Sequence, residues 1–178
     1  MIEFRTLALA VTLIVVNGSG SVALDAQAAT PAIQTPSIAI TISLEKDHFH
    51  VGEKPHATVF MRNISGHEVD FSTASDHFRV HVEGKDGAPT ETEWQRHRHG
   101  DFRSGDGPEL MDGPVISRPI APGASDYQTY DLTLFYDLGL PGKYVVYMDI
   151  YDPSGPQDGS GLWLRTNSAK FEMEAKAQ

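Results

Sequence analysis

One stretch decides the fold that this chain predicts: HFRVHVE, residues 77–83. Phe78, Val80 and Val82 alternate there with polar residues without an exception. Because successive side chains of an extended chain point to opposite faces, this period predicts a strand with one buried and one wet face. The stretch runs into Gly84-Lys85-Asp86-Gly87, a composition typical of a turn.

The same two-residue period recurs on both sides of that stretch. Residues 144–151 are apolar on both faces apart from Asp149, which predicts a central strand covered on either side. The other segments with alternating apolar positions are residues 38–44, 56–62, 69–71, 130–134 and 169–173. About seven such strands, with no helical period, predict an all-β fold: an antiparallel immunoglobulin-like β-sandwich over residues 38–176.

Two turn signals support the sandwich. In LGLPGKY, residues 138–144, Pro141-Gly142 stands just ahead of Tyr144. This resembles a tyrosine corner, in which the phenol hydroxyl bonds to upstream backbone and fixes the crossover between sheets. Ile120-Ala121-Pro122-Gly123 predicts a similar turn, because proline presets φ and glycine accepts a positive φ.

Residues 87–119 lack the two-residue period and predict a long irregular loop. Loops of this length inside a compact domain are often functional. Trp94 and Phe102 flank His97 and His99 in this segment. We take these four as candidate binding residues, because aromatic and cationic side chains anchor many interfaces. The alternative is that one or both rings fold back as a lid over the edge of the sandwich.

The N-terminus predicts export. Arg5 precedes an apolar run at residues 6–16, and Ala26-Gln27-Ala28 offers the small-x-small pattern that signal peptidases cleave. We therefore predict a signal peptide at residues 1–28, a flexible lead-in at 29–37, and a periplasmic or extracellular mature protein. The apolar run is short for a membrane-spanning helix, so no stable membrane insertion is expected after cleavage.

Composition narrows the partners and the chemistry. The 178 residues carry a formal net charge of −10 and no cysteine. A nucleic-acid partner is not expected, because phosphate binding needs a basic surface. The absence of cysteine excludes disulfides, thiol catalysis and cysteine-ligated metals. A protein or polymer partner fits the composition, whereas the oligomeric state does not follow from it.

Histidines invite a metal hypothesis. His48-Phe49-His50 and His97-Arg98-His99 are the sharpest pairs, because residues two apart in an extended chain share a face. The sequence fixes no third ligand, and the alternative is that these imidazoles face solvent. Asp149, Asp152 and Asp158 match no EF-hand and predict an ordinary loop. We therefore predict neither a metal nor a cofactor.

Motifs of catalysis are missing from the sequence. We find no nucleophile elbow, zinc helix, phosphate loop or dinucleotide fingerprint, and we predict no enzyme and no catalytic residue. A carboxylate pair for glycoside hydrolysis stays open, since its spacing is set in space. Asn63-Ile64-Ser65 fits a glycosylation sequon, which matters only in a eukaryotic host.

The order of turn and corner motifs resembles exported bacterial immunoglobulin-like domains, with a layout similar to the BsuPI-type proteinase inhibitor domain. The motifs are Gly52-Glu53, Arg62-Asn63-Ile64-Ser65, Asp86-Gly87-Ala88-Pro89, Ala121-Pro122-Gly123, Tyr136-Asp137-Leu138 and Pro141-Gly142-Lys143-Tyr144. The resemblance covers about residues 38–173 and implies a fold rather than an activity. It supplies no catalytic residue to this chain.

Three functional hypotheses follow. The first is a non-catalytic binding or structural module of the envelope or exterior, which contacts a protein or polymer through the long loop or a sheet edge. The second is a secreted proteinase inhibitor, which requires a loop rigid enough to enter a protease cleft. The third is histidine-based metal binding, which requires ligands from several segments to converge.

Overall fold

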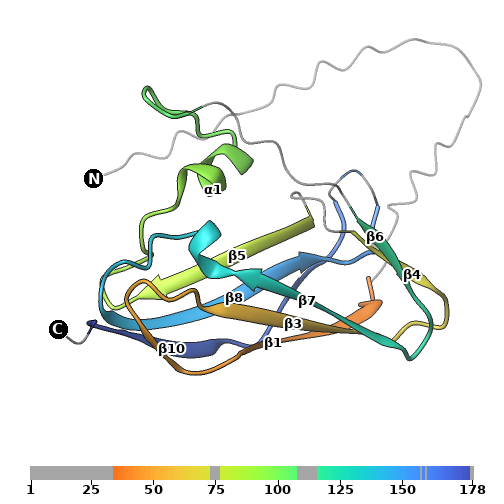
Figure 1. The fold of residues 1–178 in the computed structure, drawn as a ribbon. Helices are drawn as coiled ribbons and strands as arrows, with labels where there is room; N and C mark the ends of the chain where they lie inside the picture. Colours follow the sequence, from red (N-terminus) through yellow and green to blue (C-terminus); the bar gives the residue numbers. More distant parts are fainter. Residues whose placement is uncertain (1–33, 73–76, 108–115, 157, 159, 177–178) are drawn as a thin grey trace, which may run out of the picture. The chain divides into compact units, whose positions relative to one another are not determined.

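The computed structural model describes residues 34–72, 77–107, 116–156, 158 and 160–176 (Figure 1). The predicted signal peptide and residues 29–33 of the lead-in lie outside the described residues. Within the described part of the chain, no helix is both long enough and apolar enough to cross a lipid bilayer.

Two sheets form the domain, and a short two-stranded ladder lies beside them. The first sheet has the order β1 (Ile38–Leu44), β3 (His56–Asn63), β7 (Ser125–Asp131). The second has the order β2 (His48–His50), β10 (Ala169–Glu174), β8 (Gly142–Tyr151), β5 (Phe78–Gly84), with β9 (Trp163–Arg165) also paired to β8. The ladder joins β4 (Val69–Ser72) to β6 (Ser117–Ile120). The named strand pairs are antiparallel except β2 with β10. The predicted all-β immunoglobulin-like sandwich is therefore confirmed.

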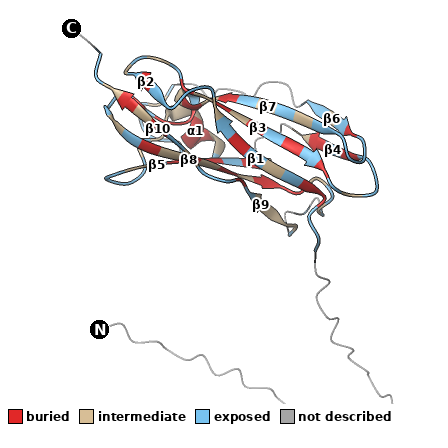
Figure 2. Cartoon of the chain, turned by 90° about the horizontal axis from the view of Figure 1, so that it is seen from below, coloured by how far each residue is buried: buried red, intermediate tan, exposed pale blue. Residues whose placement is uncertain are grey.

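The core lies between the facing sheets and follows the two-residue period. Along β3, β5 and β8, every second side chain is buried, and Figure 2 shows the alternation along the strands. Val59, Val80 and Met148 are among the largest fully buried side chains. Each such side chain contributes about 1.5–3 kcal/mol to the free energy of folding through removal from water.

Three strands were not predicted, and one was placed wrongly. β2, β6 and β9 have three or four residues, too few to display a period of two. The predicted strand at residues 130–134 instead divides at Asp131, where β7 ends and the 3₁₀ helix η2 (Leu132–Leu134) begins. The Asp131 carboxylate accepts hydrogen bonds from the N–H and hydroxyl of Thr133, which caps the turn.

Strand β8 is a central strand, as predicted, and lies between β10 and β5, but it is not covered on both faces. Its inward side chains are buried, whereas Val145, Tyr147 and Asp149 are half-buried on the outer face. Side chains of the same sheet, rather than a second layer, shield that face. The tyrosine corner is confirmed, because the hydroxyl of Tyr144 donates to the carbonyl of Leu140 at 2.9 Å.

Two buried polar residues join the ends of the strands. Asn63 is completely buried, and its side-chain amide donates to the carbonyls of His67 and Ile120. The glycosylation sequon is therefore a structural junction in this fold. Ser37, the last residue of the predicted lead-in, is buried and donates through its backbone N–H and its hydroxyl to Asp152. Packed structure thus reaches into the predicted lead-in.

Candidate functional site

Part of the predicted irregular loop is a short helix, α1 (Glu93–Arg98). Thr92 caps its N-terminus, because the Thr92 hydroxyl accepts a hydrogen bond from the backbone N–H of Gln95. The backbone N–H of Thr92 donates to the carbonyl of Phe135, and that of Asp137 donates to the carbonyl of Thr90. The prediction of an irregular loop over 87–119 is therefore wrong for residues 93–98 and for β6. A helix of six residues leaves little periodicity to recognise.

Trp94 turns toward the core. Its ring packs edge to face on Phe135, with centroids 5.2 Å apart. The Arg98 guanidinium lies 4.9 Å from the centroid of the Trp94 ring and 4.3 Å from that of Phe78. This is the lid arrangement that the sequence offered as the alternative to an exposed recognition surface. Trp94 is consequently a packing residue of the sandwich edge.

Asp106 joins the helix to the loop that follows it. Its carboxylate accepts two hydrogen bonds from Arg96, at 2.9 and 2.7 Å, and one from the backbone N–H of Arg103 at 2.7 Å. The Nε2 atom of His97 lies 3.0 Å from the same carboxylate. The Arg96 guanidinium, followed by the Arg103 N–H, holds the pKa of Asp106 well below its ordinary value. The cluster thus clamps the loop against the helix.

The predicted binding residues do not converge on one surface. His97 is buried under Phe102, whose ring stacks on it at 4.5 Å between centroids. Phe102 is itself 54 % exposed. His99 lies at the exposed C-terminal end of the helix, where its Nε2 atom is 2.9 Å from the Gln95 amide nitrogen. The expectation that His97 and His99 share a face is wrong. Each residue of a helix is rotated by about 100° from the one before it, so residues two apart point in nearly opposite directions.

Glu93, His97 and Asp106 place ligand-type atoms within 4.8 Å of one another. The groups already have partners, because Glu93 accepts the N–H of Gly107 and Asp106 accepts Arg96. Nδ1 of His97 is buried without a partner in the described structure, so we assign the ring proton to Nε2, which donates to Asp106. A divalent cation would have to displace that proton and lie beside a guanidinium. The geometry therefore favours a structural clamp over a metal centre.

The other histidine pair, His48 and His50, faces solvent, as the alternative to metal binding predicted. Phe49 is buried, whereas His48 and His50 are exposed on either side of it. His48 Nδ1 lies 2.9 Å from the carboxylate of Glu174 in β10, and His50 Nδ1 lies 3.8 Å from it. The hydrogen bond to Glu174, followed by the charge of Asp47, raises the pKa of His48. This edge therefore carries exposed ion pairs.

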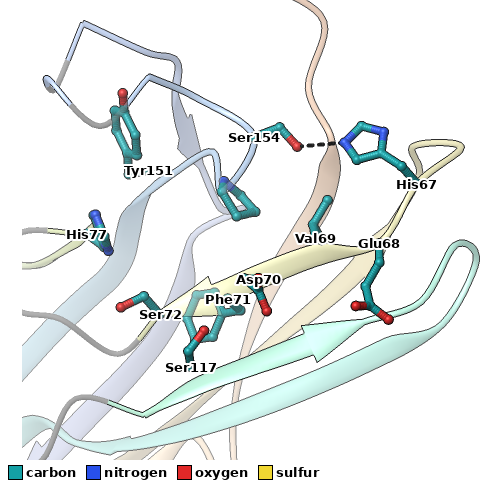
Figure 3. Close-up of a pocket in the computed structure, with 11 residues that line it drawn as sticks. His67, Glu68, Val69, Asp70, Phe71, Ser72, His77, Ser117, Tyr151 and Ser154 are labelled. Atoms are coloured by element: carbon teal, nitrogen blue, oxygen red, sulfur yellow. Dashed lines mark hydrogen bonds between the residues drawn. The ribbon is translucent and has the colours of Figure 1, made fainter.

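A cleft of about 510 Å³ lies between β4 and the segment that follows β8 (Figure 3). His67 and Ser154 form a hydrogen bond at 3.2 Å on one wall. His77 stacks on Tyr151 at the other, with centroids 5.8 Å apart. Glu68 and Asp70 also line the cleft, yet its histidines and carboxylates do not form a group of three close metal donors among the described residues. The cleft therefore offers no assembled metal site among the described residues, and His67 and Ser154 on its wall are bonded to each other.

The outer face of the second sheet is covered by its own charged and aromatic side chains. We call this surface the paired face; it consists of Arg79, His81, Glu83, Tyr147, Asp149 and Arg165. Arg165 donates two hydrogen bonds to Asp149, at 2.8 and 2.9 Å, and His81 approaches the same carboxylate at 3.1 Å. The Arg165 contact lowers the pKa of Asp149. Charges on this face are therefore neutralised within the sheet.

The outer face of the first sheet is different. We call three of its cross-strand rows the open face: Ala39-Arg62-Ser125, Thr41-Phe60-Tyr127 and Ser43-Thr58-Thr129. In the next row, His56-Asp131, the Asp131 carboxylate pairs with Lys54 at 3.3 Å. Phe60 and Tyr127 are 46 % and 60 % exposed, with ring centroids 6.2 Å apart. Sequence reasoning missed both residues. The available signal was Phe60 itself, which falls on the wet side of an alternating strand.

The comparisons with known proteins assign the chain neither a family nor a function. No family model and no curated protein matches the chain. The similarity to the BsuPI-type domain therefore stays a prediction. The structure defines the chain by class only, as an immunoglobulin-like β-sandwich module.

Solved structures with a similar fold include one isolated domain and parts of larger enzymes. The CARDB domain of the PF1109 protein from Pyrococcus furiosus, solved with di-metal ions, is 13 % identical with a TM-score of 0.37, over 79 % of this chain and 89 % of that chain. A β-glucosidase from Erythrobacter marinus is 11 % identical with a TM-score of 0.43, over 78 % of this chain. A β-glucosidase from Listeria innocua, in complex with glucose, is 15 % identical with a TM-score of 0.40, also over 78 %. The chain spans 16 % of the length of either β-glucosidase.

Proposed function

We propose that this protein is an exported, non-catalytic binding module whose contact surface is the open face. The observation that carries the proposal is the exposure of Phe60 and Tyr127 side by side on a sheet face. Exposed apolar surface costs about 25 cal/mol per Å² in water, and contiguous exposed patches mark interaction sites. A partner laid on these rings removes that cost.

The carboxylates with lowered pKa values support a non-catalytic role. Asp106 and Asp149 each owe the lowered pKa first to a contacting arginine. Stabilised in this way, a carboxylate is a weak proton acceptor and does not match the requirement of a general base near neutral pH. Both residues support the architecture, Asp106 in the helix–loop clamp and Asp149 on the paired face.

The helix–loop segment gives less support to proteinase inhibition. That hypothesis requires an extended segment that enters a protease cleft, whereas residues 93–98 are helical and Trp94 points into the domain. The binding module is therefore the function that the geometry favours. Incubation of the purified domain with serine, cysteine and metalloproteases should leave their activities unchanged.

A photo-crosslinker tests the contact surface. We would place benzoylphenylalanine at Phe60 in cells that produce the protein, and at Lys143, exposed on the outer side of β8, as the matched control. The expected result is a covalent adduct, to a protein or to a polysaccharide, from position 60 and none from position 143. An equal yield at the two positions, or no adduct at position 60, would refute the proposed contact surface.

Export is tested separately. The mature protein recovered from the periplasm or medium should begin at Ala29, as N-terminal sequencing can determine. An intact Met1 on protein that stays in the cytoplasm would contradict export without affecting the contact surface.

A further inference from the structure

The open face combines two aromatic rings with a hydroxyl-rich surround. Around Phe60 and Tyr127 stand the small or hydroxyl-bearing residues Ala39, Thr41, Ser43, Thr58, Ser125 and Thr129. The hydroxyls of Thr58 and Thr129 lie 3.0 Å apart across the strands. Flanking positions therefore offer donors and acceptors next to flat apolar rings.

Charge distinguishes the three rows of the open face from the neighbouring row of the same sheet, where Asp131 pairs with Lys54 and His56 lies beside Glu45. Of the nine positions in its three rows, Arg62 alone is charged, in a chain with a formal net charge of −10. An anionic polymer needs several cations to replace its counterions, and a single arginine does not supply them. Serine and threonine are under-represented among the anchor residues of protein interfaces, whereas they occupy five of the nine positions on this face. The charge pattern thus fits an uncharged partner.

We propose that the open face binds an uncharged polysaccharide. Sugar rings present C–H surfaces that pack on aromatic faces, and their hydroxyls exchange hydrogen bonds with serine and threonine. Phe60 and Tyr127 supply the stacking platform, and Thr41, Thr58 and Thr129 supply the polar contacts beside it. This inference rests on the proposed function and names the partner class of the same surface.

Sedimentation with insoluble polysaccharides tests the inference directly. The purified domain is mixed with cellulose, chitin or β-1,3-glucan, and cross-linked polygalacturonate serves as the charged control. We expect retention on at least one neutral matrix and none on polygalacturonate. Retention should persist in 1 M NaCl, because salt screens ion pairs and not stacking.

The double variant F60T/Y127T removes the platform. It reproduces at the central row the threonine pair already present at Thr58 and Thr129, so the strands keep suitable residues. We expect at least a tenfold loss of affinity for the retained matrix. F102A, which removes an exposed ring from the helix–loop segment, is the matched control and should bind as wild type does. Should F60T/Y127T not fold, Y127T should weaken binding and Y127W should retain it.

Several outcomes would overturn the inference: no retention on any neutral matrix, retention unaffected by loss of both rings, or retention lost in 1 M NaCl. A homodimer that F60T/Y127T dissociates would also overturn it, since a second copy would then cover the face. A protein adduct at position 60 without polysaccharide retention would refute this inference and leave the proposed function standing. Absence of both would refute both.

Discussion

The two outer faces of the sandwich differ in how far their side chains are paired with one another. On the paired face, Asp149 is bonded to Arg165 and His81, and Tyr147 donates to Glu83 at 2.9 Å. On the open face, the rings of Phe60 and Tyr127 lie exposed beside each other. A surface that satisfies its own groups gains little from a partner, whereas exposed rings gain by being covered. The difference therefore separates scaffold from contact surface.

The largest expected effect belongs to the paired face. D149A removes the carboxylate shared by Arg165 and His81; because Arg165 is 61 % exposed, the free energy of unfolding should fall by about 1–2 kcal/mol. Urea denaturation measures the change. D47A is the matched control, because Asp47 is 82 % exposed and 3.9 Å from its histidine neighbour, and it should shift stability by less than about 0.5 kcal/mol. An equal loss of stability in D149A and D47A would contradict the structural role assigned to the paired face.

The second expected effect is a pH dependence that resides on the paired face. Contact with Arg165 lowers the pKa of Asp149 in the folded state, so this residue contributes stability above its unfolded pKa of about 4. That contribution is lost as pH falls through the lowered folded pKa. In D149N the decline of stability below about pH 4 should be shallower than in wild type. Thermal melts between pH 2 and 7 would show it, and an unchanged slope would contradict the assignment.

Two hydroxyl deletions compare the faces with the smallest chemical change. Y147F removes the donor to Glu83 and should cost about 0.5–1.5 kcal/mol of unfolding free energy. Y127F removes a hydroxyl from an exposed ring on the open face, and its unfolding free energy should stay within about 0.5 kcal/mol of wild type. Parallel urea denaturation of the two variants and the wild type would measure both changes in unfolding free energy. A larger cost for Y127F would mean that the open face is structurally engaged.

The effect of F60T/Y127T on stability is expected to be smaller than that of D149A. These rings form one exposed cross-strand pair, which contributes about 0.2–1 kcal/mol. A loss of less than about 1 kcal/mol, together with loss of partner binding, would identify the rings as functional. A change in melting temperature comparable to that of D149A would instead make them part of the scaffold.

Local periodicity predicted most of the strands because the cause is local. In β3 and β5 each buried residue is two positions from the next, so a short window of sequence carries the pattern. The Tyr144 corner was equally readable, since its acceptor is only four residues away at Leu140. By contrast, the clamp at Asp106 depends on how the chain returns to helix α1, and it was missed.

The sequence by itself determined the sandwich, its buried faces and the tyrosine corner, because alternation and turn chemistry act between near neighbours. Only the tertiary structure decided the surfaces. Phe60 and Tyr127 are 67 positions apart in the chain and meet through the β3–β7 register. Asp149 and His81 meet across β5 and β8 in the same way. Pairing register is a property of the assembled sheet, so which face is neutralised and which is left open could be known only from the fold.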